Sequence, residues 1–194
     1  MRHIPDRLGA MLDANVLYPF LVRNILLLLS FADAGLYRPL WTDRINEEWS
    51  SNLIEKFPEK EAQIKATIQV MDGAFPEALV RQYEDLIEAL QLPDIDDRHV
   101  LAAAIRGGAK VIVTENLRDF PSVILEQYGL DALTADEFVL NALEICPADA
   151  VKALERMRLR YANPLHDPEQ LLKAMLRCGL ARTVAFLTPQ VESV

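Results

Sequence analysis

The stretch Leu92–Phe120 constrains the fold more than any other part of the chain. Its helical run His99–Arg106 ends at Gly107-Gly108, and the apolar run Val111–Val113 that follows is typical of a buried parallel strand. A polar turn begins at Thr114, directly after that strand. Because ligands of open α/β sheets bind beyond the carboxyl ends of the strands, we expect the chemistry of this protein to lie at this turn.

Strands and helices alternate along most of the chain, which is the pattern of a parallel sheet covered by helices on both faces. The expected strands are Leu8–Leu12, Tyr37–Trp41, Val111–Val113 and Leu130–Leu133. Helices are expected between them, among others from Pro19 to Gly35, after the N-cap Thr42, and at Glu59–Met71 and Glu77–Leu90. From Pro147 onward the pattern indicates helices alone. We therefore predict an α/β domain over residues 1–146 and a C-terminal helical extension over residues 147–194.

The formal net charge of −9 argues against a simple nucleic-acid-binding module, because phosphate contacts need clustered Lys and Arg. It does not argue against an enzyme that bridges its acids to phosphates through a divalent cation. A local excess of positive charge occurs in the C-terminal part, where Lys152, Arg156 and Arg160 recur at helical spacing. These basic residues either form a solvated helix face or contact RNA, and the sequence leaves both interpretations open.

The sequence also bounds the environment of the protein. Cys146 and Cys178 are far apart and form no CxxC motif, so neither a zinc site nor a disulfide framework is supported. The N-terminus lacks a signal-peptide pattern, and the apolar run Ile25–Phe31 is far shorter than the ~20 residues of a membrane span. We expect a cytoplasmic protein without membrane association. We expect Ile25–Phe31 to be core, with a homodimer interface as the alternative.

Acidic residues fall repeatedly at predicted strand ends and helix starts. Asp13 follows the first strand, and Asp119 follows the strand at Val111–Val113. Glu48 lies on the helix after Thr42, and Asp97 opens the central helix. Carboxylates gathered in one pocket repel each other unless a cation lies among them, and Mg²⁺ or Mn²⁺ prefers such oxygen ligands. One or two such ions could activate a water and clamp a phosphodiester.

Each of these residues also has a purely structural interpretation. Asp13 could be a turn residue, Glu48 a solvated acid on a helix face, and Asp97 a helix cap, as could Asp94 or Asp96. The doublets Glu47-Glu48 and Asp96-Asp97 leave the register of the ligand open at each place.

Three neighbours of these acids have open roles as well. Asn116, a natural turn residue like Asp119, could orient a carboxylate or contact a phosphate. Thr114 either bonds a neighbouring acid or only ends a strand. We expect His99, which lies among apolar residues, to be structural rather than catalytic.

Four motifs, taken in their order and spacing, resemble one protein family. They are Leu12–Leu17 with its Asp, Glu48 six residues after Thr42, Asp97–Ala104, and Val113–Phe120 with a Thr-x-Asn-x-x-Asp-Phe pattern. Together they resemble the PIN-domain family of metal-dependent ribonucleases, which includes the VapC-type toxins of toxin–antitoxin pairs. The resemblance spans roughly Met11 to Leu143.

The resemblance implies a three-layer α/β/α sandwich around a parallel sheet and a metal-dependent endoribonuclease acting on RNA. It implies that Mg²⁺ or Mn²⁺ is held by four catalytic acids, Asp13, Glu48, Asp97 and Asp119, with Asn116 and Thr114 in support. A cognate antitoxin protein would be the partner. The helices beyond Pro147 exceed the minimal family domain. The alternative function is a non-catalytic PIN-like module that binds RNA or protein.

Overall fold

A computed structural model describes residues 8–31, 35–161 and 167–189. The chain divides into two packing units that do not follow the chain order. The first unit combines Met1–Tyr18 with Arg38–Leu133, and the second combines Pro19–Tyr37 with Thr134–Val194. These packing units do not test the predicted domain boundary between residues 146 and 147, which stays a prediction.

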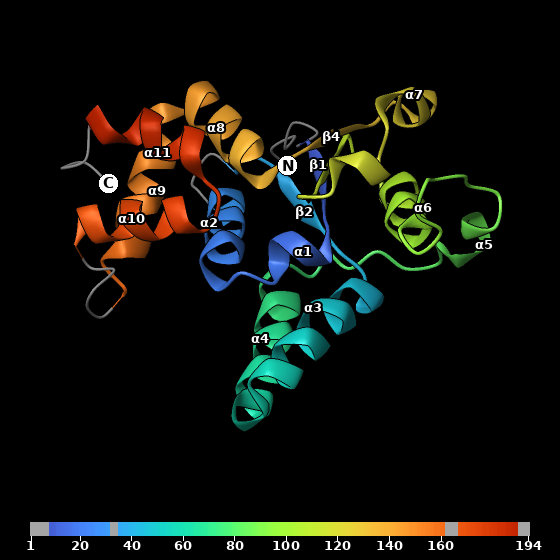
Figure 1. The fold of residues 1–194 in the computed structure, drawn as a ribbon, viewed down its shortest axis with the longest axis horizontal. Helices are drawn as coiled ribbons and strands as arrows, with labels where there is room; N and C mark the ends of the chain where they lie inside the picture. Colours follow the sequence, from blue (N-terminus) through green and yellow to red (C-terminus); the bar gives the residue numbers. More distant parts are fainter. Residues whose placement is uncertain (1–7, 32–34, 162–166, 190–194) are drawn as a thin grey trace, which may run out of the picture. The chain divides into compact units, whose positions relative to one another are not determined.

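The first unit is built on a parallel sheet of short strands in the order β2-β1-β3-β4 (Figure 1). The strands are β1 (Gly9–Leu12), β2 (Arg38–Leu40), β3 (Val111–Val113) and β4 (Asp131–Leu133). All three pairings between neighbouring strands are parallel. The α/β class with a parallel sheet, predicted from the alternation of strands and helices, is confirmed.

The two central strands are buried apolar runs, and their register determines what lies at the sheet edge. Every residue of β1 and β3 is buried. Leu12 pairs with Val113, the last residues of their strands. The backbone N–H of Asp13 then donates to the carbonyl of Val113 at 3.1 Å. Asp13 and Thr114 therefore leave the sheet side by side, although they are far apart in sequence.

Helices connect the strands of the first unit. They are α1 (Ala14–Leu17), α3 (Asp43–Lys56), α4 (Glu61–Ala74), α5 (Glu84–Ile87), α6 (Arg98–Arg106) and α7 (Ser122–Leu125), with short 3₁₀ turns at Pro58–Lys60, Leu117–Asp119 and Glu126–Tyr128. Thr42 caps α3 as predicted, since its Oγ1 accepts from the backbone N–H of Ile45 at 3.0 Å. Helix α6 ends at Arg106 with Gly107 as its C-cap, and Gly108 turns the chain toward β3 with a φ of 64°.

The helix expected at Glu77–Leu90 is wrong for most of its length. Only α5 is helical there. The preceding residues run extended beside Trp41: the Trp41 N–H donates to the Ala78 carbonyl at 3.0 Å, and the Val80 N–H donates to the Trp41 carbonyl at 2.8 Å. These hydrogen bonds next to β2 outweigh a local helical preference that is weak in a segment beginning after Pro76.

The second unit consists of helices. They are α2 (Phe20–Phe31), α8 (Ala135–Ile145), α9 (Pro147–Arg158), α10 (Pro168–Arg177) and α11 (Ala181–Leu187). Helix α2 contacts α8, α9 and α10, and its Ile25, Leu26 and Leu29 are fully buried, as expected for core. A capping box is present at the start of α8, with Thr134 and Glu137 bonded to each other's backbone. Within the described residues, no helix is both long and apolar enough to cross a membrane.

Candidate metal centre

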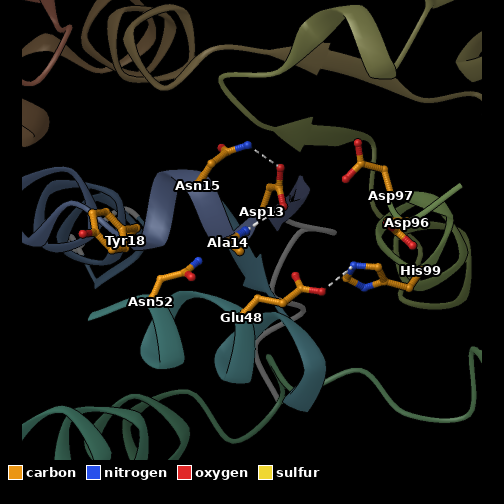
Figure 2. A pocket seen from close by; sticks show the side chains of 9 residues that line it. All are labelled: Asp13, Ala14, Asn15, Tyr18, Glu48, Asn52, Asp96, Asp97 and His99. Carbon is orange, nitrogen blue, oxygen red and sulfur yellow. Dashed lines mark hydrogen bonds and ion pairs between the residues drawn. The ribbon is translucent and has the colours of Figure 1, made fainter. Parts of the chain in front are cut away.

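A pocket of about 610 Å³ lies in the first unit, beyond the carboxyl end of β1. Its lining comes from α1 and the residues flanking it, from α3, and from the start of α6 with the segment before it (Figure 2). The lining residues are Asp13, Ala14, Asn15, Tyr18, Glu48, Asn52, Asp96, Asp97 and His99. Three of the four acids predicted as ligands therefore share one pocket, although they are far apart in the sequence.

Asp13 is the most constrained acid of the pocket. Its Oδ1 accepts from the Ala14 N–H at 2.7 Å, and its Oδ2 accepts from Thr114 Oγ1 and from Asn15 Nδ2, each at 2.7 Å. Burial raises the pKa of the Asp13 carboxyl and the charge of Glu48 adds to this, while the bonds from Thr114 and Ala14 lower it. Thr114, which is fully buried, thus bonds a neighbouring acid, the first of its two predicted roles.

Glu48 projects from α3 into the pocket and is held by two donors. His99 Nε2 lies 3.1 Å from Glu48 Oε1, and Arg44 Nε lies 3.0 Å from the same oxygen. Partial burial of Glu48 favours its neutral form, but the hydrogen bonds and charges of His99 and Arg44 outweigh this and lower its pKa. Glu48 is therefore ionised at neutral pH. Glu47 is exposed and does not line the pocket.

Asp97 occupies the N-cap position of α6 but makes no capping hydrogen bond there. Its Oδ2 is buried and has no hydrogen-bond partner among the described residues. Burial, together with the negative charges of Asp13, Asp94 and Asp119, raises the pKa of the Asp97 carboxyl to about 6. The charges of the acids thus act on one another, and three neighbouring acids act on Asp97.

Asp119 belongs to the same group of acids. One oxygen each from Asp94, Asp97 and Asp119 lies within 4.8 Å of the other two. Asn116 Nδ2 donates to Asp119 Oδ2, so its amide orients a carboxylate. Asp94 Oδ1 accepts from the Asp96 N–H at 2.9 Å, which closes a local turn before α6. Asp97 lines the pocket and is also one of these three acids, so the acid group is continuous with the pocket.

The donor set fits a divalent cation. The acids offer carboxylate oxygens, the ligands that hard cations prefer, and a buried carboxylate oxygen without a donor is an unmet polar group that a cation would satisfy. Positive charge at this place would also relieve the repulsion that raises the pKa of Asp97. A cation therefore explains the two features of Asp97 that helix capping does not.

Sequence reasoning missed several contributors to this site, among them Asn15, which bonds Asp13, and Tyr18 and Asn52, which line the pocket. His99 was expected to be structural, yet its ring bonds Glu48 from another helix. Arg44 received no role, although its place four residues before Glu48 on one helix was a usable signal. Asp94 was considered only as a cap, and its closeness to Asp119 has no signal in the local sequence.

Comparison with known proteins identifies two matched regions. Residues 9–118 match the family described as PIN domain, and residues 135–189 match the family described as VapC50 C-terminal domain. The first region includes Asp13, Glu48 and Asp97, and Asp119 follows it directly.

A curated relative supports the same family. A protein of Mycobacterium tuberculosis (strain ATCC 25618 / H37Rv) named "Putative ribonuclease VapC50" is 41% identical over 93 residues, which cover 48% of this chain and 54% of that protein. The chain thus spans about half the length of the curated relative that it matches. No solved structure matched the chain. With more than half of its residues covered by the PIN-domain match, and with the acids of its motifs meeting at one edge of a parallel sheet, the chain belongs to the PIN-domain family.

Proposed function

We propose that this protein is a metal-dependent endoribonuclease that hydrolyses RNA phosphodiester bonds, with Mg²⁺ or Mn²⁺ held by Asp13, Glu48, Asp97 and Asp119. The observation that carries the proposal is Asp97, whose buried Oδ2 lacks a donor among the described residues while other acids surround it. Membership in the PIN-domain family supports it, as does the word ribonuclease in the name of the relative.

Each residue of the site has a defined task in this proposal. Thr114 and Asn15 fix the Asp13 carboxylate, and the Asn116 amide fixes that of Asp119. Glu48 stays ionised at neutral pH, whereas Asp97 gives up its proton near pH 6. The chemistry supplied by a bound divalent cation is the activation of water and the neutralisation of charge on a phosphodiester.

Water is the nucleophile in this proposal, so no side chain has to attack the phosphate. The described lining of the pocket accordingly contains carboxylates, amides, one imidazole and one phenol, and no Ser, Cys or Lys. The side chains bind and orient: Asp13, Glu48 and Asp119 are held by hydrogen-bond donors, whereas Oδ2 of Asp97 has no donor among the described residues.

The uncharged side of the pocket is suited to the substrate. Tyr18 and Asn52 line it, on the side away from Asp97 and His99 (Figure 2). The described residues of the first unit carry many more acids than bases, so backbone phosphates find few cationic partners there. We propose that a nucleobase of single-stranded RNA stacks on the Tyr18 ring, with the Asn52 amide bonding its edge.

Removing the Tyr18 ring is therefore expected to weaken substrate binding. Stacking of a base on an aromatic ring contributes roughly 1–3 kcal/mol, so Tyr18→Ala should raise KM about tenfold with a smaller change in kcat. Tyr18→Phe should stay close to wild type. Steady-state cleavage of a short RNA oligonucleotide measures both constants. Tyr128→Ala, an exposed tyrosine outside the pocket, is the matched control, and equal effects of the two alanine variants would contradict the assignment.

The role of a toxin is a further part of the proposal. The motifs resemble VapC-type toxins, and both the relative and the matched C-terminal domain carry a VapC name. We propose that the chain is the toxin of a toxin–antitoxin pair and binds a cognate antitoxin protein. A small neighbouring reading frame whose product co-purifies with this chain and suppresses its RNA cleavage would support this part independently of the chemistry.

Cleavage of total cellular RNA tests the proposed activity. Purified protein with Mn²⁺ is expected to yield discrete fragments, whose ends identify the target. EDTA should abolish them, and so should Asp97→Asn, which removes one negative ligand and nearly preserves the shape. RNA left intact by folded wild-type protein with Mn²⁺ present would favour a non-catalytic binding module instead.

A further inference from the structure

His99 and Arg44 both direct their hydrogen bonds to one oxygen of Glu48. The distances to Glu48 Oε1 are 3.1 Å from His99 Nε2 and 3.0 Å from Arg44 Nε. Among the described residues, no hydrogen bond reaches Oε2 of the same carboxylate. The two oxygens of Glu48 therefore differ: one is held by the protein, and the other remains available.

The ring of His99 is committed to this contact. Its side chain is 3% exposed, and its Nδ1 is buried without a partner in the described part of the chain. A carboxylate oxygen only accepts, so Nε2 carries a hydrogen, and the buried Nδ1 has no hydrogen-bond partner among the described residues. A buried nitrogen left in this way destabilises the fold. An apolar side chain would fill the same space without a buried polar atom that lacks a partner. The hydrogen bond to Glu48 therefore accounts for a histidine at this position.

Arg44 links Glu48 to the segment that carries the central acids. Its Nη2 lies 3.4 Å from the backbone carbonyl of Asp96, while its Nε bonds Glu48 one helical turn away on α3. The Arg44 side chain is 45% exposed, so its ion pair with Glu48 contributes little to stability. Its geometry instead connects α3 with the residue that precedes Asp97.

We infer that His99 and Arg44 are positioning residues, which together hold Oε1 of Glu48 and leave Oε2 as the oxygen that faces a divalent cation. This inference rests on the proposed metal site. Hydrogen-bond partners of a ligating carboxylate typically change metal affinity 10- to 100-fold when they are removed. The expected effect of losing either partner is thus on cation binding, with the larger effect for the buried His99.

Binding of Mn²⁺ to the full chain, measured by isothermal titration calorimetry, tests the inference. His99→Leu is expected to weaken Mn²⁺ binding at least tenfold, and Arg44→Ala several-fold with little change in melting temperature. His99→Gln can place an amide N–H near the position of Nε2, so it should recover part of the affinity. Arg106→Ala removes an exposed arginine that pairs with Asp85 at the other end of α6, and this matched control should bind like wild type.

A double-mutant cycle separates positioning from packing. In a Glu48→Ala background, His99→Leu should have no further effect on Mn²⁺ affinity, because the carboxylate that it positions is gone. An equal loss of affinity with and without Glu48 would overturn the inference, as would wild-type affinity of both His99→Leu and Arg44→Ala. If His99→Leu fails to fold, Arg44→Ala and His99→Gln take its place in the same cycle with Glu48→Ala and test the inference by the same criterion. Wild-type protein that binds no Mn²⁺ and leaves RNA intact would instead overturn the proposed function, and the inference with it.

Discussion

Asp97→Asn is expected to raise the melting temperature of the metal-free protein at pH 7.5 and at the same time to abolish RNA cleavage. The wild-type carboxyl has a folded-state pKa of about 6, above its ordinary value of 3.8, because it is buried among Asp13, Asp94 and Asp119. Ionising it in the folded protein therefore reduces the free energy of unfolding. Asparagine cannot ionise, so the variant lacks this destabilisation.

The pH dependence of the free energy of unfolding follows from the raised pKa of Asp97. The folded state holds the Asp97 proton more tightly than the unfolded state, so its contribution to stability is complete below about pH 4 and is lost as pH rises through 6. The full shift would correspond to about 3 kcal/mol, and solvent screening of this half-buried group reduces it to about 1 kcal/mol. That amounts to roughly 2–4 °C in melting temperature, and wild type and variant should converge near pH 4.

Mn²⁺ should reverse the order of the two proteins. A cation that binds only the folded state raises its melting temperature, and the wild type has the full set of acids to bind it. Thermal unfolding with EDTA and with Mn²⁺, at pH 4 and pH 7.5, measures each of these effects. Cleavage by the variant should fall on the order of 100-fold or more if the proposed function holds, because Asp97 would be one of the residues that hold the divalent cation.

The matched control for this experiment is Asp131→Asn, which removes the same charge from an exposed position on β4. It should leave metal-free stability, the response to Mn²⁺ and cleavage near wild type. A metal-free Asp97→Asn protein that is less stable than wild type at pH 7.5 would contradict the view of Asp97 as a strained ligand. It would restore the interpretation of Asp97 as a structural helix-start residue.

The ends of the central strands were predictable because local rules determine them. Buried apolar runs place Asp13 and Thr114 after parallel strands, and the strand register then brings them together. The cap at Thr42 and the capping box at Thr134 were predictable for the same reason, since each depends on residues within one turn.

Contacts between distant segments were not predictable in this way. His99 meets Glu48 across two helices, and no periodicity in either helix indicates such a bond. The segment before α5 becomes extended because Trp41 offers it backbone hydrogen bonds, which a local helical preference cannot reveal. The short helix α1 was not predicted because it begins almost directly after β1. Asp13 is the one residue between them, and its side chain accepts a hydrogen bond from the Ala14 N–H at the start of α1.

A second large effect is expected in the helical unit, where Asp136→Ala should lower the melting temperature by about 10 °C. Asp136 is buried at the start of α8, and its two oxygens accept from the backbone N–H groups of Arg182 and Thr183, each at 2.8 Å. Those groups belong to the first turn of α11 and have no partner within that helix. Hydrogen bonds to a charged group contribute about 1.5–3 kcal/mol each, so losing both costs roughly 3–5 kcal/mol.

Two further variants define the origin of this effect. Asp136→Asn keeps one accepting oxygen and should lose about half as much stability, because its amide cannot accept from the second N–H. Asp149→Ala removes an exposed acid from the first turn of α9 and should change the melting temperature little. Urea unfolding of the variants measures these free energies, and an Asp149→Ala loss equal to that of Asp136→Ala would contradict the assignment.

The position of Asp136 explains how the C-terminal helices form a unit although α11 had no sequence signal of its own. The matched C-terminal region, residues 135–189, begins at the first residue of α8 and extends past α11. Asp136 and Glu137 hold the start of α11, since Glu137 Oε1 also lies 3.3 Å from Arg182 Nη1. Helix α8 therefore stabilises the start of α11. A helix of this length is marginal in isolation, so α11 should be the first element to unfold when the Asp136 carboxylate is removed.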